Sequence, residues 1–173
     1  ILMSISLFIG GTRSGKSILA ENAALNYQAP RLYVATAVPT DDEMEKRIAA
    51  HKERRKGLFD TIEEALFLNK VFSEKNNHYN IVMIDCLTFW YNNLFFYFDD
   101  SKKRENVADL FLDSLRQTKT AVILVTNEVG LSVVPENKLA REFVDFSGKI
   151  NQKIASICHD VYFVVAGKKM RLE

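Results

Sequence analysis

The sequence predicts an α/β fold in which helices cover a mostly parallel β-sheet. The first observation is that short apolar runs alternate with segments of helical periodicity along the chain. The second is that these runs are continuous, as expected of strands that are buried on both faces of a sheet. The third is a glycine-rich segment between the first apolar run and the first helical segment, a place where α/β proteins commonly bind phosphate.

Length and composition favour one soluble domain. The 173 residues carry 23 Lys and Arg against 22 Asp and Glu, and 47% of them are hydrophobic. A chain of this length buries one full core, so residues 1–173 are expected to form a single domain. The near-zero net charge argues against a nucleic-acid-binding protein, and no apolar run reaches the roughly 18 residues of a membrane span. Cys86 and Cys158 lack the spacing of a metal site, which favours a reducing, cytoplasmic location.

The strands are predicted from apolar runs and the helices from periodicity. The opening run lacks the basic residues and the cleavage site of a signal peptide, so it is predicted as the first strand. Segment 41–56 has acidic residues in its first turn and basic residues in its last, which complements the helix dipole. The last helical segment has apolar residues at intervals of three and four. The predicted strands are 2–9, 32–35, 81–84, 121–125 and 161–166, and the predicted helices are 17–27, 41–56, 64–72, 103–118 and 137–158.

Residues 10–17 match the phosphate-binding pattern G-x-x-x-x-G-K-[ST] at every fixed position. Glycines let backbone N–H groups converge on phosphate oxygens, and the dipole of the following helix favours the negative charge. Lys16 is predicted to reach the β- and γ-phosphates, and the Ser17 hydroxyl is predicted to ligate Mg²⁺. The pattern therefore predicts a nucleotide-binding protein whose phosphate-binding loop consists of Gly10, Gly11, Thr12, Arg13, Ser14, Gly15, Lys16 and Ser17.

Polar residues follow two of the later apolar runs. Asp85 comes directly after the run 81–84 and is predicted to organise Mg²⁺ beside the loop, with capping of the next helix as the alternative. Thr126, Asn127 and Glu128 follow the run 121–125. Polar residues at the carboxyl ends of parallel strands line ligand-binding crevices, and a loop-capping role fits these three residues equally well.

Two further features leave alternatives open when the residues are considered alone. His51 lies on the predicted helix 41–56 beside Arg47 and Arg54, a grouping that suits either a bound polyphosphate or a solvated cationic helix end. Seven aromatic residues occupy the ten positions of segment 89–98, which is too apolar for a helix surrounded by water. This segment is predicted to lie in the core or in a subunit interface, with the wall of a ligand pocket as the alternative.

Blocks that follow the loop in a fixed order are more specific than the loop itself. They are Tyr33-Val34-Ala35-Thr36-Ala37, Asp42-Glu43-Met44 with Arg47-Ile48 and His51, Thr61-Ile62-Glu63-Glu64, Asp85-Cys86-Leu87-Thr88, Val125-Thr126-Asn127-Glu128-Val129-Gly130 and Val134-Pro135-Glu136-Asn137. Together with the loop they resemble the bifunctional adenosylcobinamide kinase / adenosylcobinamide-phosphate guanylyltransferase family of cobalamin biosynthesis. The resemblance covers nearly the whole chain.

The resemblance implies an enzyme with two steps. Adenosylcobinamide would be phosphorylated with ATP or GTP, and GMP would then pass from GTP to adenosylcobinamide phosphate, giving adenosylcobinamide-GDP. In the family the second step passes through a guanylylated histidine, which corresponds here to His51. A neutral imidazole that attacks the α-phosphate divides one difficult transfer into two easier ones. The resemblance thus implies that His51 is catalytic, in addition to Lys16, while Ser17 and Asp85 are expected to hold Mg²⁺ from the loop pattern and the strand end.

The resemblance also implies a recombinase-like P-loop NTPase fold, a three-layer sandwich with one antiparallel strand, and a homotrimer. Segment 167–173 departs from the usual apolar ending of the family, and no strand is predicted in it.

Two alternatives stay open for the function: a P-loop small-molecule kinase without guanylyltransferase activity, and a nucleotide-dependent switch without chemistry on a small substrate. Beyond the loop, the implied GTP contacts are Thr36, Ala37, Val38, Lys52, Glu53, Arg54, Arg55, Glu63 and Asp85.

Overall fold

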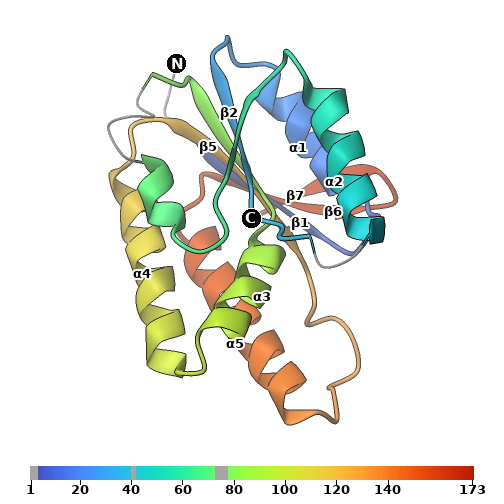
Figure 1. The fold of residues 1–173 in the computed structure, drawn as a ribbon, viewed down its shortest axis with the longest axis vertical. Coiled ribbons are helices and arrows are strands. Elements are labelled where there is room, and N and C mark those ends of the chain that lie inside the picture. The colour runs from blue at the N-terminus through green and yellow to red at the C-terminus, as the bar shows by residue number, and fades with distance from the viewer. Residues whose placement is uncertain (1–3, 40–41, 73–77) are drawn as a thin grey trace.

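The computed structural model describes residues 4–39, 42–72 and 78–173, and its centre is a seven-stranded sheet (Figure 1). The strand order is β3-β2-β4-β5-β1-β6-β7. All neighbouring strands are parallel except β7, which pairs antiparallel with β6 at one edge. The predicted sheet with one antiparallel strand is therefore confirmed. The strands are β1 (Ile5–Gly10), β2 (Arg31–Ala35), β3 (Asp60–Glu63), β4 (Ile81–Asp85), β5 (Ala121–Asn127), β6 (Asp160–Val165) and β7 (Lys168–Leu172).

Helices cover both faces of this sheet, which confirms the three-layer sandwich (Figure 1). Leu7 and Ile9 of β1 enter the core on one face, whereas Phe8 enters the core on the other. Side chains of a strand alternate between faces, so a strand that is covered on both sides is apolar throughout. Within the part of the chain that the structure describes, every helix is too short or too polar to cross a membrane. One face carries α1 (Lys16–Ala24) and α2 (Asp42–Arg55), and the other carries α3 (Leu87–Tyr97), α4 (Ser101–Gln117) and α5 (Lys138–Ala155).

Two strands have no counterpart among the predicted elements. Three of the four residues of β3 are exposed, and so are all five residues of β7. Both strands lie at the edges of the sheet, where a single neighbouring strand supplies the hydrogen bonds and the side chains remain in water. An edge strand of this kind has no continuous apolar run, and the apolar-run criterion therefore misses it.

The predicted helix at 64–72 is wrong over its first half. An oxygen of the Glu64 carboxylate accepts hydrogen bonds from the backbone N–H groups of Leu66 and Phe67, at 2.9 and 2.8 Å. The indole N–H of Trp90 donates to the carbonyl oxygen of Leu66 at 2.8 Å. Side chains thus take up backbone groups that a helix would pair internally, and only the short 3-10 helix η1 (Leu68–Phe72) forms.

The aromatic segment 89–98 forms most of α3, and its side chains lie in different environments. Trp90 and Tyr91 are fully buried, so the predicted core position is confirmed for these two residues. Phe89 lines the cavity that is described below, which is the pocket-wall alternative. Phe96 and Tyr97 at the end of the helix are 82% and 53% exposed.

Candidate functional site

The phosphate-binding loop joins β1 to α1, as its pattern predicts. Gly10 ends β1, and a Cβ at this position would lie 2.2 Å from the carbonyl oxygen of Val164 in β6. Only glycine therefore allows the two strands to approach this closely. Gly15 precedes α1 with φ +93°, a left-handed conformation that side chains disfavour. The N–H of Ser14 donates to the carbonyl oxygen of Gly11 at 3.2 Å and closes the turn ahead of the positive end of α1.

Lys16 lies against this loop. Its Nζ donates a hydrogen bond to the carbonyl oxygen of Gly11 at 3.0 Å, and the residue is only 8% exposed. Burial lowers the pKa of Lys16 below its ordinary value, and the charge of the nearby Asp85 works against that shift. A phosphate oxygen is a stronger acceptor for an ammonium group than a carbonyl oxygen is. The side chain is therefore held next to the place where a phosphate would bind.

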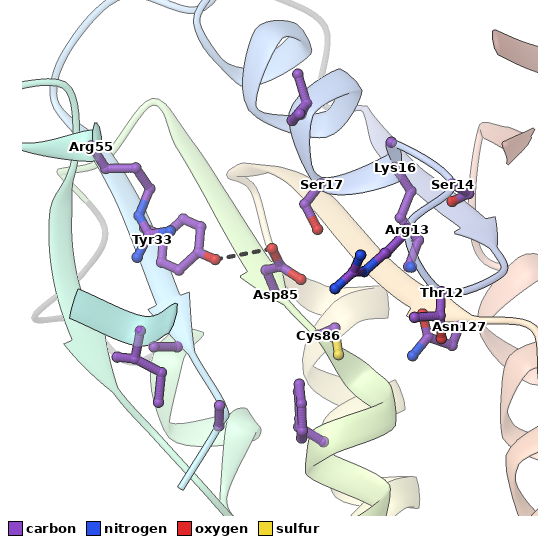
Figure 2. Close-up of a pocket in the computed structure, with 16 residues that line it drawn as sticks. Thr12, Arg13, Ser14, Lys16, Ser17, Tyr33, Arg55, Asp85, Cys86 and Asn127 are labelled. Carbon is purple, nitrogen blue, oxygen red and sulfur yellow. Dashed lines mark hydrogen bonds between the residues drawn. The ribbon is translucent and has the colours of Figure 1, made fainter. Parts of the chain in front are cut away.

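A cavity of about 550 Å³ lies between the loop, the carboxyl ends of β2 and β4, and α2 (Figure 2). Its volume is within the usual range for small-molecule sites. The carboxyl ends of parallel strands are also where open α/β sheets bind ligands. The cavity is lined by Thr12, Arg13, Ser14, Gly15, Lys16, Ser17, Ile18, Tyr33, Ala35, Ala37, Ile48, Arg55, Asp85, Cys86, Phe89 and Asn127.

Asp85 reaches the cavity from the end of β4. Figure 2 shows its carboxylate between Tyr33 on one side and the loop residues Ser17 and Arg13 on the other. The Tyr33 hydroxyl donates a hydrogen bond to Oδ2 of Asp85 at 3.0 Å. The helix-capping alternative for Asp85 is wrong, because the residue at the N-cap of α3 is Cys86.

Helix α2 contributes a buried arginine to the cavity. Arg55 is 3% exposed, and its Cζ lies 3.5 Å from the centroid of the Tyr33 ring. Its Nη1 is 3.7 Å from Oε1 of Glu21, while Nε and Nη1 form no hydrogen bond with any residue that the structure describes. A buried cation with unused donors is well suited to binding an anion. Burial raises the pKa of Tyr33 well above its ordinary value, and the charge of Asp85 adds to this shift.

The residues after β2 divide between the cavity and the surrounding structure. The Thr36 hydroxyl is fully buried, donates to the carbonyl oxygen of Cys86 at 2.7 Å, and accepts from the Cys86 N–H at 2.9 Å. It thereby joins the ends of β2 and β4 behind the cavity. Ala37 lines the cavity, whereas Val38 is exposed and lies outside the lining.

Two exposed residues of α2, Lys52 and Glu53, form ion pairs outside the cavity lining. Lys52 pairs with Glu63 of β3 at 2.5 Å, and Lys56 pairs with Glu53 at 3.5 Å. All four side chains are exposed to water, so these contacts contribute little to stability. Neither pair belongs to the wall of the cavity.

The side chains of His51 and Arg54 lie outside the residues that the structure describes. The backbone of α2 still locates position 51, because Ile48 and Arg55 both line the cavity. Position 51 is three residues after Ile48 and four before Arg55, and residues at these intervals share one face of a helix. The face of α2 that contains position 51 therefore borders the cavity.

The polar residues at the end of β5 have separate roles. Asn127 lines the cavity, as expected for a residue at the carboxyl end of a parallel strand. A carboxylate oxygen of Glu128 instead accepts a hydrogen bond from the N–H of Gly130 at 2.6 Å, which is the loop-capping alternative. Thr126 is fully buried, with its hydroxyl 3.3 Å from that of Thr88.

Tyr33 is the functional candidate that the sequence reasoning missed. It lies in a predicted buried strand and in a block that carries the family resemblance, but no role in the site is predicted for it, although Ala35 and Ala37 follow it at intervals of two. All three residues line the cavity, as the period of a strand requires. A hydroxyl inside an otherwise apolar strand was the available signal. Four other lining residues were not predicted to belong to the site: Ile18, Ala35, Ile48 and Cys86.

Fold and site together place the chain among the P-loop nucleotide-binding proteins. A KaiC-like protein of Pyrococcus horikoshii has a TM-score of 0.52 at 16% identity, covering 92% of this chain and 70% of its own. The RadB recombinase has a TM-score of 0.53 at 15% identity, covering 92% and 73%. At such low identity the likeness concerns the fold alone, and it confirms the recombinase-like architecture.

The chain belongs to the cobinamide kinase / cobinamide phosphate guanyltransferase family, whose model matches residues 6–172. A bifunctional adenosylcobalamin biosynthesis protein, CobP of Pseudomonas aeruginosa, is 40% identical over 167 residues, covering 96% of each chain. CobU of Escherichia coli, with the same description, is 34% identical over 179 residues, covering 96% of this chain and 98% of its own. The resemblance inferred from the motifs is thereby confirmed, and the family is one of kinases and nucleotidyltransferases.

Proposed function

We propose that the protein carries out both reactions of its family. It phosphorylates adenosylcobinamide with ATP or GTP, and it then transfers GMP from GTP to adenosylcobinamide phosphate, giving adenosylcobinamide-GDP and pyrophosphate. The observation that carries the proposal is a single cavity bordered by the phosphate-binding loop, by Asp85 and by the face of α2 that contains position 51. This arrangement offers one place for a nucleoside triphosphate to meet both a phosphate-binding lysine and a nucleophile.

The donor set beside the loop suits Mg²⁺. Ser17 supplies a hydroxyl and Asp85 a carboxylate, and both line the cavity. The described residues contain no group of three or more His, Cys, Asp or Glu that could hold a metal by themselves. Mg²⁺ is commonly bound by one or two protein oxygens together with nucleotide phosphates, which fits such a sparse set. When bound, the ion would neutralise charge on the phosphates.

In the kinase step, the loop and Lys16 bind and orient the phosphates. The N-terminal end of α1 and the Lys16 ammonium favour the negative charge that develops on the transferred phosphoryl group. The hydroxyl of adenosylcobinamide attacks the γ-phosphorus, and the bond to the leaving nucleoside diphosphate breaks. Catalysis of this kind depends on positioning and charge stabilisation, and the loop needs no covalent bond to the substrate.

In the guanylyltransferase step, we assign the nucleophile to His51. A neutral imidazole nitrogen attacks the α-phosphorus of GTP, pyrophosphate leaves, and a phosphoramidate forms. The phosphate of adenosylcobinamide phosphate then attacks the same phosphorus, and the bond to nitrogen breaks. The assignment is supported by the place of position 51 on α2 and by family membership, since His51 is the sole histidine of this helix. The buried guanidinium of Arg55, one turn further on, is suited to the phosphates of the nucleotide.

The remaining GTP contacts are proposed from the resemblance. Ala37 and Arg55 line the cavity, which supports their assignment. Thr36 would contribute its backbone or hold the wall in place, because its hydroxyl is already paired with the backbone of Cys86. The residues outside the cavity lining would approach a nucleotide that extends beyond it: Val38, Lys52, Glu53 and Glu63.

We further propose that residues 1–173 form one domain that works as a homotrimer in the cytoplasm. A single sheet contains strands from both ends of the chain, which supports one domain. The trimer comes from the resemblance, and the location comes from the spacing of Cys86 and Cys158, which favours a reducing compartment. Light scattering on the purified protein would test the trimer, which predicts a mass three times the 19.8 kDa of the chain.

Intact-mass spectrometry after incubation with GTP and Mg²⁺, without corrinoid, tests the proposal. We expect an acid-labile adduct of GMP mass that maps to His51. The His51→Ala variant should lose the adduct and keep at least part of the adenosylcobinamide kinase activity. His78→Ala is the matched control, because His78 is exposed in a turn and should keep both activities. A folded, GTP-binding wild-type protein without the adduct would favour the small-molecule kinase that lacks guanylyltransferase activity.

A further inference from the structure

Tyr33 connects two parts of the candidate site (Figure 2). It is 4% exposed in β2, its hydroxyl donates to Asp85, and its ring lies beneath the guanidinium of Arg55. The Phe59 ring packs edge-on against the Tyr33 ring, with 6.1 Å between the centroids. One side chain thus contacts the proposed metal-binding carboxylate and the end of the helix that contains position 51.

The hydroxyl of Tyr33 constrains the carboxylate of Asp85. An aspartate at the end of a strand can rotate about its side-chain bonds, and a hydrogen bond to one oxygen restricts the plane of the group. The 3.0 Å bond from Tyr33 falls on Oδ2. Partners of this kind orient metal ligands, and removal of such a partner commonly weakens metal binding by about 10- to 100-fold.

The ring of Tyr33 constrains α2. Arg55 is the last residue of this helix, and the stacking distance of 3.5 Å is that of a close cation–π contact. Such contacts are strongest when both groups are shielded from water, as these two are. The acidic side chain of Glu21 on α1 lies 3.7 Å from the same guanidinium and favours its charge. Arg55 and Tyr33 therefore connect the carboxyl-terminal end of α2 to the sheet, as the exposed Lys52–Glu63 pair also does.

We propose that Tyr33 is a positioning residue for both steps of the reaction. Its hydroxyl orients Asp85 toward Mg²⁺, and its ring holds Arg55 so that the face of α2 with position 51 stays at the cavity. Tyr33 need not touch the reacting atoms. The inference rests on the proposed function and deepens it, because it names a residue on which the metal site and the histidine helix both depend.

Tyr33→Phe tests the hydroxyl alone, because the ring and its stacking on Arg55 remain. We expect the Mg²⁺ concentration for half-maximal activity to rise about tenfold, with kcat recovering at high Mg²⁺. Binding of Mn²⁺ to the enzyme–GDP complex, which cannot form the GMP adduct with release of pyrophosphate, is followed by electron paramagnetic resonance and should weaken by a similar factor. Tyr91→Phe is the matched control: Tyr91 is fully buried, its hydroxyl donates to Asn151 at 2.8 Å, and it lies outside the cavity lining.

Tyr33→Leu tests the ring. At saturating Mg²⁺ we expect the rate of GMP-adduct formation to fall at least about tenfold below that of Tyr33→Phe, a loss the size of one lost buried contact. Arg55→Lys keeps the charge but loses the planar stack, and it should slow adduct formation in the same direction. This second variant tests the stack if Tyr33→Leu fails to fold, with the rate measured at saturating GTP because Arg55 is also a proposed GTP contact.

The outcomes separate the inference from the function on which it rests. A folded wild-type protein that forms no adduct would overturn the proposed function and the inference with it. An active wild-type protein whose Tyr33→Phe variant keeps the same Mn²⁺ affinity would overturn the role of the hydroxyl alone. Equal losses in Tyr33→Phe and Tyr91→Phe would show a general effect of losing a buried hydrogen bond. Unchanged adduct formation in Arg55→Lys would overturn the role of the stack.

Discussion

The backbone N–H of Gly167 donates a hydrogen bond to the carbonyl oxygen of Ser14, over 2.8 Å. Gly167 lies in the turn between β6 and β7, and Ser14 lies in the phosphate-binding loop. The two segments also pack closely, because a Cβ on Gly15 would lie 3.1 Å from the Cα of Gly167. The hairpin at the edge of the sheet therefore supports the loop from outside the cavity.

We expect Gly167→Val to weaken nucleotide binding. Gly167 has φ +72°, and a β-branched residue is strained there by roughly 1–3 kcal/mol. The turn should shift and release the Ser14 carbonyl, which raises the Kd for GDP by about tenfold, the equivalent of about 1.4 kcal/mol. Titration of a fluorescent GDP analogue, well below the melting temperature, measures this change. Lys168→Ala, at the start of β7, removes only an exposed side chain and should leave Kd unchanged. An unaltered Kd in a less stable Gly167→Val protein would limit the hairpin to a role in stability.

We expect Gly10→Ala to destabilise the fold. The added methyl group would meet the Val164 carbonyl at 2.2 Å, so β1 and β6 must move apart. Overpacking of this kind costs roughly 1–3 kcal/mol or more in the free energy of unfolding. Urea denaturation measures the loss. Gly148→Ala is the control, because that position is inside α5 with no atom within 4 Å of the new Cβ, and it should gain roughly 0.5–1 kcal/mol. Equal stability of the wild type and Gly10→Ala would contradict the close pairing of these strands.

We expect Lys16→Ala to impair both reactions. Its ammonium lies against the loop where the phosphates of either nucleotide would bind, and the loss of one such group costs on the order of 10²–10³-fold in kcat. Separate assays of corrinoid phosphorylation and of GMP-adduct formation measure the two effects. Lys119→Ala, an exposed lysine outside the cavity lining, should behave as the wild type. Unaffected turnover in Lys16→Ala would disprove the assignment of the loop.

We expect the free energy of unfolding to fall in alkaline solution. Burial raises the pKa of Cys86 and of Cys158 to about 12, from an ordinary value of 9.0. Above pH 9 the unfolded chain loses these protons first, so this contribution to stability is fully present below about pH 9 and is lost as the pH rises towards 12. Urea denaturation at about pH 8 and pH 10.5 measures the change. The Cys158→Ala variant should show a smaller fall, and a fall as steep as that of the wild type would show that other groups are responsible.

Much of the catalytic end of the protein was predictable from local sequence. The loop, the buried strands and Asp85 at the end of β4 each depend on spacing within one segment. The helix 41–56 was predicted from its charge pattern, and α2 covers residues 42–55 of it, with residue 41 outside the described residues. The prediction of a helix at 64–72 failed over its first half because the Glu64 side chain accepts hydrogen bonds from backbone N–H groups that a helix would pair internally.

The sequence by itself determined the class of fold, the nucleotide-binding loop and the family, because periodicity and fixed motif spacing are properties of short segments. Only the tertiary structure decided that Tyr33 links Asp85 to Arg55 and that the β6–β7 turn supports the loop. It also revealed the edge strands β3 and β7, which pair through backbone groups and whose side chains are mostly exposed. The physical reason is the same in each case: these contacts join groups from distant segments, and no local pattern records which backbone or side chain will lie opposite.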